Sequence, residues 1–460
     1  MPTPADLSHD FASMVANTQY ENLPASAIEG AKKSILDTIG VILGASGVEP
    51  SVRSVVELVR EAGGNPESSV LGFGGRAPAL MAAFANGAMA HCLDFDDHAP
   101  EGHHPSSSIV PAVFALAERA GGVSGREMIA AVAAGQEVFL RLRRNVESRK
   151  DWHLTTVLGV FSAAAAAARV LRLSPESVGD AFGYAGMQCC GTMEMMYSTG
   201  SSQRGLYAGF STKGAVLAAM MAQKGISGVQ TMFEGKAGLF NVYFGGKYNR
   251  EGMVADLGKV YSGGEILYKP WPSCGVSHGF IHSTLTLMKE HKLTIDDIKE
   301  LRVNVGDFGF ELCTPIEDRR APQTSADAKF SIPFCVAVAA THGWPKVEHF
   351  FGDGLKDPAV LAAAKKVVPV PDPAFDWNSK LPKGRLDIET VDGRTISMVG
   401  DEVPGDAECP MSWDYLYQKF EDTAKLAAVP ASMEKMRKVQ EMVRHLETLD
   451  DATEVLRVLG

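Results

Sequence analysis

A short polar stretch between two apolar runs gathers many of the residues in this chain that could transfer protons. Residues 91–104 hold three Asp, one Glu and four His within fourteen positions. Imidazole changes its charge near neutral pH, and a carboxylate can either orient an imidazole or accept a proton itself. The stretch therefore predicts a catalytic or binding loop.

Two other interpretations of this stretch stay open from sequence alone. Clusters of Asp and His also bind metal ions, and a polar loop can be without function. The stretch has no His-x-x-x-His pair and no neighbouring Cys pair, so the usual spacing of metal ligands is missing and we expect no metal. Asp94 and Asp96 would point to nearly opposite sides of a helix, so both can face one site only if the backbone there is not helical.

The flanking sequence indicates how such a loop would be held. Apolar residues at helical spacing precede it at about residues 78–89 and follow it at residues 109–117. Pro100, Gly102 and Pro105 prevent a regular helix between them. We expect helix, loop and helix, in which the two helices fix the ends of the loop while its side chains converge.

The rest of the chain indicates a mainly α protein. Residues 109–245 are rich in Ala, Gly and Met at helical spacing, which is typical of a closely packed bundle, and the tail from 413 to 459 is expected to be helical. A strand is expected at 298–305, and a hairpin with an Asp-Gly turn at 385–396. We predict a large all-helical domain, residues 1–265 plus 405–460, with a smaller α+β lid domain, residues 266–404, inserted into it.

Composition limits the partners of this protein. The chain has 460 residues and a net charge of −11, which argues against binding nucleic acid or an anionic membrane. Its apolar runs are too short to span a membrane, and its N-terminus does not resemble a signal peptide. Seven cysteines, with no close pair beyond Cys189 and Cys190, indicate reduced thiols and a cytoplasmic protein.

Three further motifs interrupt the apolar background. His153 precedes an alanine-rich helix, and Gln203 and Arg204 precede another helix, whose N-terminal dipole together with a guanidinium would attract a carboxylate. Lys269 lies in a Lys-Pro-Trp-Pro segment whose prolines enforce extended chain, five residues before Cys274. A lysine held in this way indicates a ligand-binding role.

These motifs together resemble the MmgE/PrpD family, which includes 2-methylcitrate dehydratases, cis-aconitate decarboxylases and iminodisuccinate epimerases. The resemblance rests on Asp94-Phe95-Asp96-Asp97, His104-Pro105-Ser106, Lys269-Pro270-Trp271-Pro272 and the block around 322–334, and it covers nearly the whole chain. It implies a homodimer with an active site between the two domains. It also implies chemistry on a small anionic di- or tricarboxylate without a metal or an organic cofactor.

The resemblance also implies roles for individual residues. Loss of a proton next to a carboxylate produces an enolate whose negative charge needs cations already in place. The implied catalytic residues are a base or acid at His104 or His153, Asp94 as base or orienting group, Lys269 as cation, and Cys274 as a second base. The implied substrate-binding residues are His98, Gln203 and Arg204.

Departures from the family pattern bear on the reaction. His98 stands where many relatives have Thr, Cys274 stands where the decarboxylases have His, and Phe334 aligns with their Tyr. We therefore predict a lyase that resembles 2-methylcitrate dehydratase. The alternatives are an epimerase in which Lys269 lowers the pKa of Cys274, a cis-aconitate decarboxylase-like enzyme, and a member that binds polycarboxylates without turnover.

Overall fold

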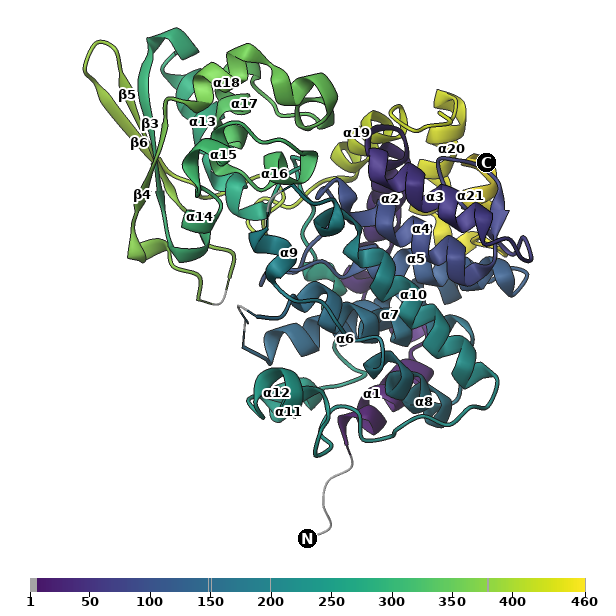
Figure 1. Cartoon of the computed structure of the whole chain (residues 1–460). Coiled ribbons are helices and arrows are strands. Elements are labelled where there is room, and N and C mark those ends of the chain that lie inside the picture. Colours follow the sequence, from purple (N-terminus) through teal and green to yellow (C-terminus); the bar gives the residue numbers. More distant parts are fainter. Residues whose placement is uncertain (1–5, 148, 150, 199, 379, 460) are drawn as a thin grey trace.

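The computed structural model describes residues 6–147, 149, 151–198, 200–378 and 380–459. It has a large helical body and a smaller lobe that carries the main sheet (Figure 1). The body also holds a two-stranded antiparallel ribbon, β1 (Ser68–Ser69) and β2 (Arg76–Ala77). Its helices are α1 (Leu7–Asn17), α2 (Ala25–Val48), α3 (Pro50–Glu61), α4 (Ala79–Cys92), α5 (Ser106–Arg119), α6 (Gly125–Arg144), α7 (Leu154–Val170), α8 (Pro175–Gly186), α9 (Glu194–Tyr197), α10 (Gln203–Gln223), α11 (Leu239–Phe244), α12 (Arg250–Val254), α19 (Trp413–Ala424), α20 (Met433–Arg444) and α21 (Glu454–Leu459).

Small residues bring the central helices of the body close together. Every residue of α7, the alanine-rich helix, is buried. Helices α4 and α10 cross at two glycines, because a Cβ on Gly87 would lie 2.3 Å from Thr212 Oγ1 and a Cβ on Gly209 would lie 2.7 Å from the carbonyl of Phe84. This close crossing fixes the end of α4, where the polar stretch begins, relative to the start of α10.

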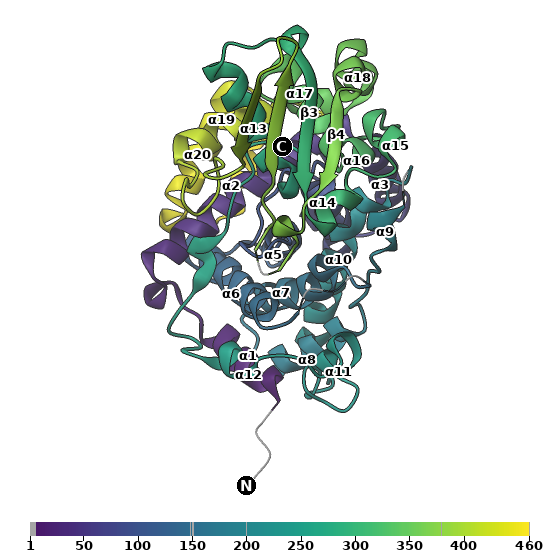
Figure 2. The same cartoon turned by 90° about the vertical axis from the view of Figure 1, so that its left-hand side faces the viewer.

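The smaller lobe is built on a four-stranded sheet. Its strand order is β4-β3-β5-β6, with β3 parallel to β4 and antiparallel to β5, and the expected strand at 298–305 and hairpin at 385–396 are both confirmed. Helices α13 and α17 lie behind the sheet, on the side that faces the body (Figures 1 and 2). The elements are α13 (Gly275–Glu290), β3 (Ile298–Val305), α14 (Asp307–Glu311), α15 (Ile316–Arg320), α16 (Ser325–Lys329), α17 (Ile332–His342), α18 (Pro358–Ala364), β4 (Val367–Pro371), β5 (Arg385–Thr390) and β6 (Thr395–Val399).

The chain returns to the body after the lobe. Helix α19 is capped at its N-terminus by Ser412, whose hydroxyl accepts from the backbone N–H of Tyr415. It packs on α2, where Gly40 and Gly44 leave space for Phe420 and Thr423. The mainly α fold with a smaller α/β part is thus confirmed.

We found no single helix in the described ranges that is long and apolar enough to cross a membrane. The pair α2 and α3, bent by 95°, passes the same test by length and composition only.

Candidate active site

Three buried lysines from distant parts of the chain hold the loop between α4 and α5. Each ammonium donates to a different backbone carbonyl at the start of the loop, from sequence separations of 237, 175 and 324 residues. The pairs are Lys329 with Cys92, Lys269 with Asp94 (2.9 Å) and Lys419 with Phe95 (2.7 Å). The lobe, the segment that enters it and the C-terminal helix α19 therefore all help to fix the backbone of this loop.

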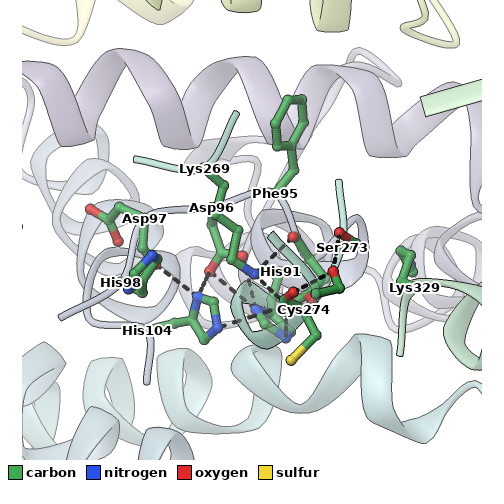
Figure 3. A network of polar contacts seen from close by, with 12 residues as sticks. His91, Phe95, Asp96, Asp97, His98, His104, Lys269, Ser273, Cys274 and Lys329 are labelled. Carbon is green, nitrogen blue, oxygen red and sulfur yellow. Dashed lines mark hydrogen bonds and ion pairs between the residues drawn. The ribbon is translucent and has the colours of Figure 1, made fainter. Parts of the chain in front are cut away.

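The loop has the irregular backbone that two converging Asp side chains require. Asp94 has a φ of 49°, in the left-handed region, and Lys269 Nζ lies 2.9 Å from both its carbonyl oxygen and its Oδ1. Asp96 Oδ1 lies 3.0 Å from His91 Nδ1, and its Oδ2 lies 3.2 Å from His104 Nδ1. Asp94 Oδ1 lies 3.8 Å and 3.7 Å from Nε2 of the same two histidines. Figure 3 labels four members of this cluster, which are Asp96, His91, His104 and Lys269.

The members of the cluster shift one another's pKa values in opposite directions. Burial alone would raise the pKa of Asp96, but His104 and His91 outweigh burial and hold that pKa well below its ordinary value. Burial would lower the pKa of His104, but Asp96 outweighs burial and raises it. His104 Nδ1 also lies 2.7 Å from the carbonyl oxygen of Asp97, so Nδ1 carries a proton. His104 is thus stabilised as an imidazolium that can donate a proton.

The cluster lies at a cavity of about 710 Å³ between the body and the lobe. From the body the lining includes Glu101 and Tyr207, and from the lobe it includes Phe308, Phe330 and Trp377. Of the residues predicted from sequence, the cavity brings together Asp94, His98, His104, His153, Lys269 and Cys274.

His153 differs electrostatically from His104. It precedes the first turn of α7, and its buried Nδ1 lacks a hydrogen-bond partner among the described residues. Burial, reinforced by His91 and His104, holds the pKa of His153 well below its ordinary value. One cavity therefore contains an imidazole that stays neutral and an imidazole that favours the charged form, which suits a base and an acid.

Sequence reasoning did not single out three further residues of the site, which are His91, His103 and Tyr207. The ring of Tyr207 lies between those of His91 and His153, with centroids 4.3 Å and 4.5 Å away. His103 lines the cavity and accepts a hydrogen bond at Nδ1 from Arg143 Nε, 3.0 Å away. Two signals were present in the sequence, because both histidines belong to the 91–104 stretch and Tyr207 lies one helical turn after a predicted site residue.

Arg204 lies beside the main cavity and lines a smaller one of about 220 Å³. Its guanidinium stacks on Phe330, 3.1 Å from the ring centroid, and Nη1 donates to the carbonyl of Met196 at 3.2 Å. Its buried Nε and Nη2 have no partner in the described ranges, and burial lowers the pKa of Arg204 to about 9. Met196, Phe308 and Glu311 line both cavities, so this cation is separated from the main cavity by one layer of side chains.

The position of Gln203 differs from the substrate-binding position that the sequence predicted. Its side chain is exposed and does not line either cavity in the part of the chain that the structure describes. The reason is geometric, because Gln203 and Arg204 are adjacent on α10 and point about 100° apart around the helix axis. Gln203 is therefore in no position to contact a ligand of these cavities.

The pKa of Cys274 shifts in the opposite direction to the one expected for an epimerase. It precedes α13 and lines the main cavity as predicted, but burial raises the pKa of its thiol to about 11. Asp94 reinforces this shift, and the opposing effect of Lys269 is smaller. The thiol therefore remains protonated at neutral pH instead of acting as the thiolate base that an epimerase would need.

The cluster also has the composition of a metal site. Ligand atoms of His91, Asp94, Asp96 and His104 all lie within 4.8 Å of one another, which the spacing in the sequence did not indicate. However, Asp96 is already engaged by both imidazoles, and the Lys269 ammonium lies 2.9 Å from Asp94 Oδ1. A divalent cation would have to displace these pairs and would be repelled by the ammonium. The geometry favours an acid–base cluster.

The chain is similar to known proteins over nearly its whole length. Over 474 aligned residues the chain is 27% identical to a cis-aconitate decarboxylase of Aspergillus terreus (strain NIH 2624 / FGSC A1156), covering 98% of this chain and 95% of that protein. Over 478 and 471 residues it is 24% identical to the cis-aconitate decarboxylases of Mus musculus and Homo sapiens, covering 98% of this chain and 93% and 94% of theirs. Residues 9–251 match the MmgE/PrpD N-terminal domain and residues 271–447 match the MmgE/PrpD C-terminal domain. The chain therefore belongs to the MmgE/PrpD family.

Proposed function

We propose that this protein is a lyase that acts on a small tricarboxylate by removing a proton next to a carboxylate, as 2-methylcitrate dehydratases do. The observation that carries the proposal is that His153 and His104 line one cavity with opposite shifts, the pKa of His153 held well below its ordinary value and the pKa of His104 raised above it. Both groups are side chains of the protein, so the proposed proton transfers require no metal or organic cofactor.

Substrate binding in this proposal depends on cations at the cavity. Arg143, Arg144 and Arg149 line it. Arg144 is paired with Glu101 and Glu265, and Arg149 with Asp151, so a substrate carboxylate would compete with these partners for two of the three guanidinium groups. Lys269, buried against Asp94, would keep a positive charge close to the developing enolate. Arg204 would provide a further cation if a carboxylate extends into the smaller cavity.

The dehydration step uses the two imidazoles in opposite roles. His153 takes the proton as the C–H bond breaks, and the negative charge of the bound substrate raises its pKa toward the working pH. His104 gives its proton to the leaving hydroxyl as the C–O bond breaks. The products are an unsaturated tricarboxylate and water, with one proton taken up and one released.

A second candidate reaction is decarboxylation of an unsaturated tricarboxylate, which the names of the compared relatives favour. In that reaction the bond to one carboxylate breaks, carbon dioxide leaves, and the carbanion takes a proton from His104. No general base is required, so His153 distinguishes the two reactions. Against an epimerase stands the protonated thiol of Cys274.

The test is proton NMR in D₂O with 2-methylcitrate, citrate, cis-aconitate and a chiral dicarboxylate as separate substrates. We expect loss of the hydroxylated tricarboxylates. Citrate should give a vinyl resonance, and the methyl doublet of 2-methylcitrate should be replaced by the singlet of a methyl group on an alkene carbon. Formation of a decarboxylated product from cis-aconitate alone would favour the second candidate. Exchange of the dicarboxylate α-proton for deuterium would favour an epimerase, and binding without any turnover would favour a non-catalytic member.

We also propose that the enzyme is a cytoplasmic homodimer and that residues 266–404 act as its lid domain. All seven cysteines are free thiols, which suits a reducing compartment. Exposed apolar side chains of the body, including Met187 and Phe210, would suit a subunit interface. Light scattering after size-exclusion chromatography tests the dimer.

A further inference from the structure

His98 is an imidazole of the main cavity whose protonated nitrogen is fixed by the backbone. Its Nδ1 lies 2.9 Å from the carbonyl oxygen of Ala99. A carbonyl oxygen only accepts hydrogen bonds, so Nδ1 must carry the proton. In the neutral ring the other nitrogen, Nε2, then has a free lone pair.

The surroundings hold the residue in place and keep its ring neutral. The backbone of His98 exchanges two hydrogen bonds with Leu267, both 2.9 Å long. Burial, with a smaller contribution from Lys269, lowers the pKa of His98 to about 3. No group in the described ranges hydrogen bonds to Nε2, and the residue lines the main cavity.

The lone pair of Nε2 favours one kind of ligand group. A carboxylate oxygen carries no proton at neutral pH and would be repelled by the lone pair, whereas a hydroxyl can donate to it. His103, which also lines the cavity, has the opposite preference. Arg143 donates to Nδ1 of His103, so Nε2 of His103 carries a proton and suits a carboxylate. The cavity thus presents an acceptor for a substrate hydroxyl at His98 and a donor for a substrate carboxylate at His103.

We infer that His98 Nε2 accepts a hydrogen bond from a substrate hydroxyl and makes the site selective for hydroxylated tricarboxylates over those that lack the hydroxyl. The inference rests on the proposed function and specifies its substrate class. The rings of His98 and His104 have centroids 6.3 Å apart. A hydroxyl between them can donate to His98 while its oxygen receives the proton of His104, so that the C–O bond breaks and water leaves.

Binding to the wild-type protein tests the inference before any variant is made. Citrate and tricarballylate carry the same three carboxylates and differ only in the hydroxyl. Isothermal titration calorimetry should show citrate binding about 10-fold more tightly, the effect of one well-made hydrogen bond whose acceptor is otherwise left unpaired. Equal affinity, or tighter binding of tricarballylate, would overturn the inference.

Two substitutions then separate Nε2 from the rest of the ring. His98→Asn keeps a donor near Nδ1 for the Ala99 carbonyl but removes Nε2, and His98→Gln places an amide near the position of Nε2. The preference for citrate should disappear in His98→Asn and persist in His98→Gln. Retention of the preference in a folded His98→Asn protein would show that another group recognises the hydroxyl.

The binding results are independent of turnover. Selective citrate binding without conversion of any tricarboxylate would support the role of His98 and refute the proposed function. Conversion of hydroxylated tricarboxylates with equal binding of the two probes would support the proposed function and refute the role of His98.

Discussion

Lys269 Nζ lies 2.9 Å from both the carbonyl oxygen and the Oδ1 of Asp94, and both residues are buried. One ammonium therefore fixes a left-handed backbone and also compensates a carboxylate that is 2% exposed. This relationship changes what the sequence indicated about Lys269, because a lysine that serves only a ligand could be removed without loss of stability. In the structure it serves the fold and the site together.

Lys269→Met should abolish turnover and destabilise the protein by about 3–5 kcal/mol, because it leaves a buried carboxylate without its counter-ion. The double variant Asp94→Asn/Lys269→Met should recover much of the melting temperature and none of the activity. Differential scanning calorimetry and the NMR assay measure the two effects, with exposed Lys236→Met as the control. An unchanged melting temperature in Lys269→Met would contradict the coupling of these residues.

The pH dependence should report His104 as the acid. Its pKa is raised above the ordinary 6.5, and the protonated form is the active one, so kcat/KM should fall as pH rises through this raised value. His104→Gln should lose about 100-fold or more in kcat and should no longer show this decline. A profile that rises through the same range would instead identify His104 as the base.

His153→Asn should distinguish dehydration from decarboxylation. The variant removes the base, so hydration or dehydration should fall by about 100- to 10,000-fold. Decarboxylation needs only the acid and should fall much less. Equal losses of both activities, in a variant that still binds citrate, would show that His153 does not act as the base.

Cys274→Ser should retain lyase activity within a few-fold, because burial keeps the thiol protonated. In wild-type protein, iodoacetamide should alkylate exposed Cys190 and Cys409 well before Cys274, as followed by peptide mass spectrometry. Rapid alkylation of Cys274 at neutral pH, together with inactivation, would restore it as a reactive base.

Activity should survive exhaustive dialysis against a chelator, because the ammonium of Lys269 occupies the place next to Asp94 where a cation would bind. The assay compares dialysed enzyme with enzyme to which Mg²⁺, Mn²⁺, Fe²⁺ or Zn²⁺ is returned. Loss of activity that one of these ions restores would make His91, Asp94, Asp96 and His104 metal ligands.

The sequence by itself determined the local elements and the place of the site. Helical spacing predicted α4 and α5 around the polar stretch, and an Asp-Gly turn predicted the β5–β6 hairpin, because these signals depend on neighbours within a few residues. The 91–104 stretch and the Lys-Pro-Trp-Pro segment also supplied Asp94, His104 and Lys269 as candidate site residues, and the structure places all three at one cavity.

Only the tertiary structure decided the charges and directions of these groups. Burial set the protonation of Cys274, His98 and His153, and burial depends on what the whole fold packs around a residue. Lys329 and Lys419 hold the loop from more than 200 residues away, a distance over which local spacing carries no information. The sequence thus predicted several of the side chains that meet at the cavity, and long-range packing determined how their pKa values shift.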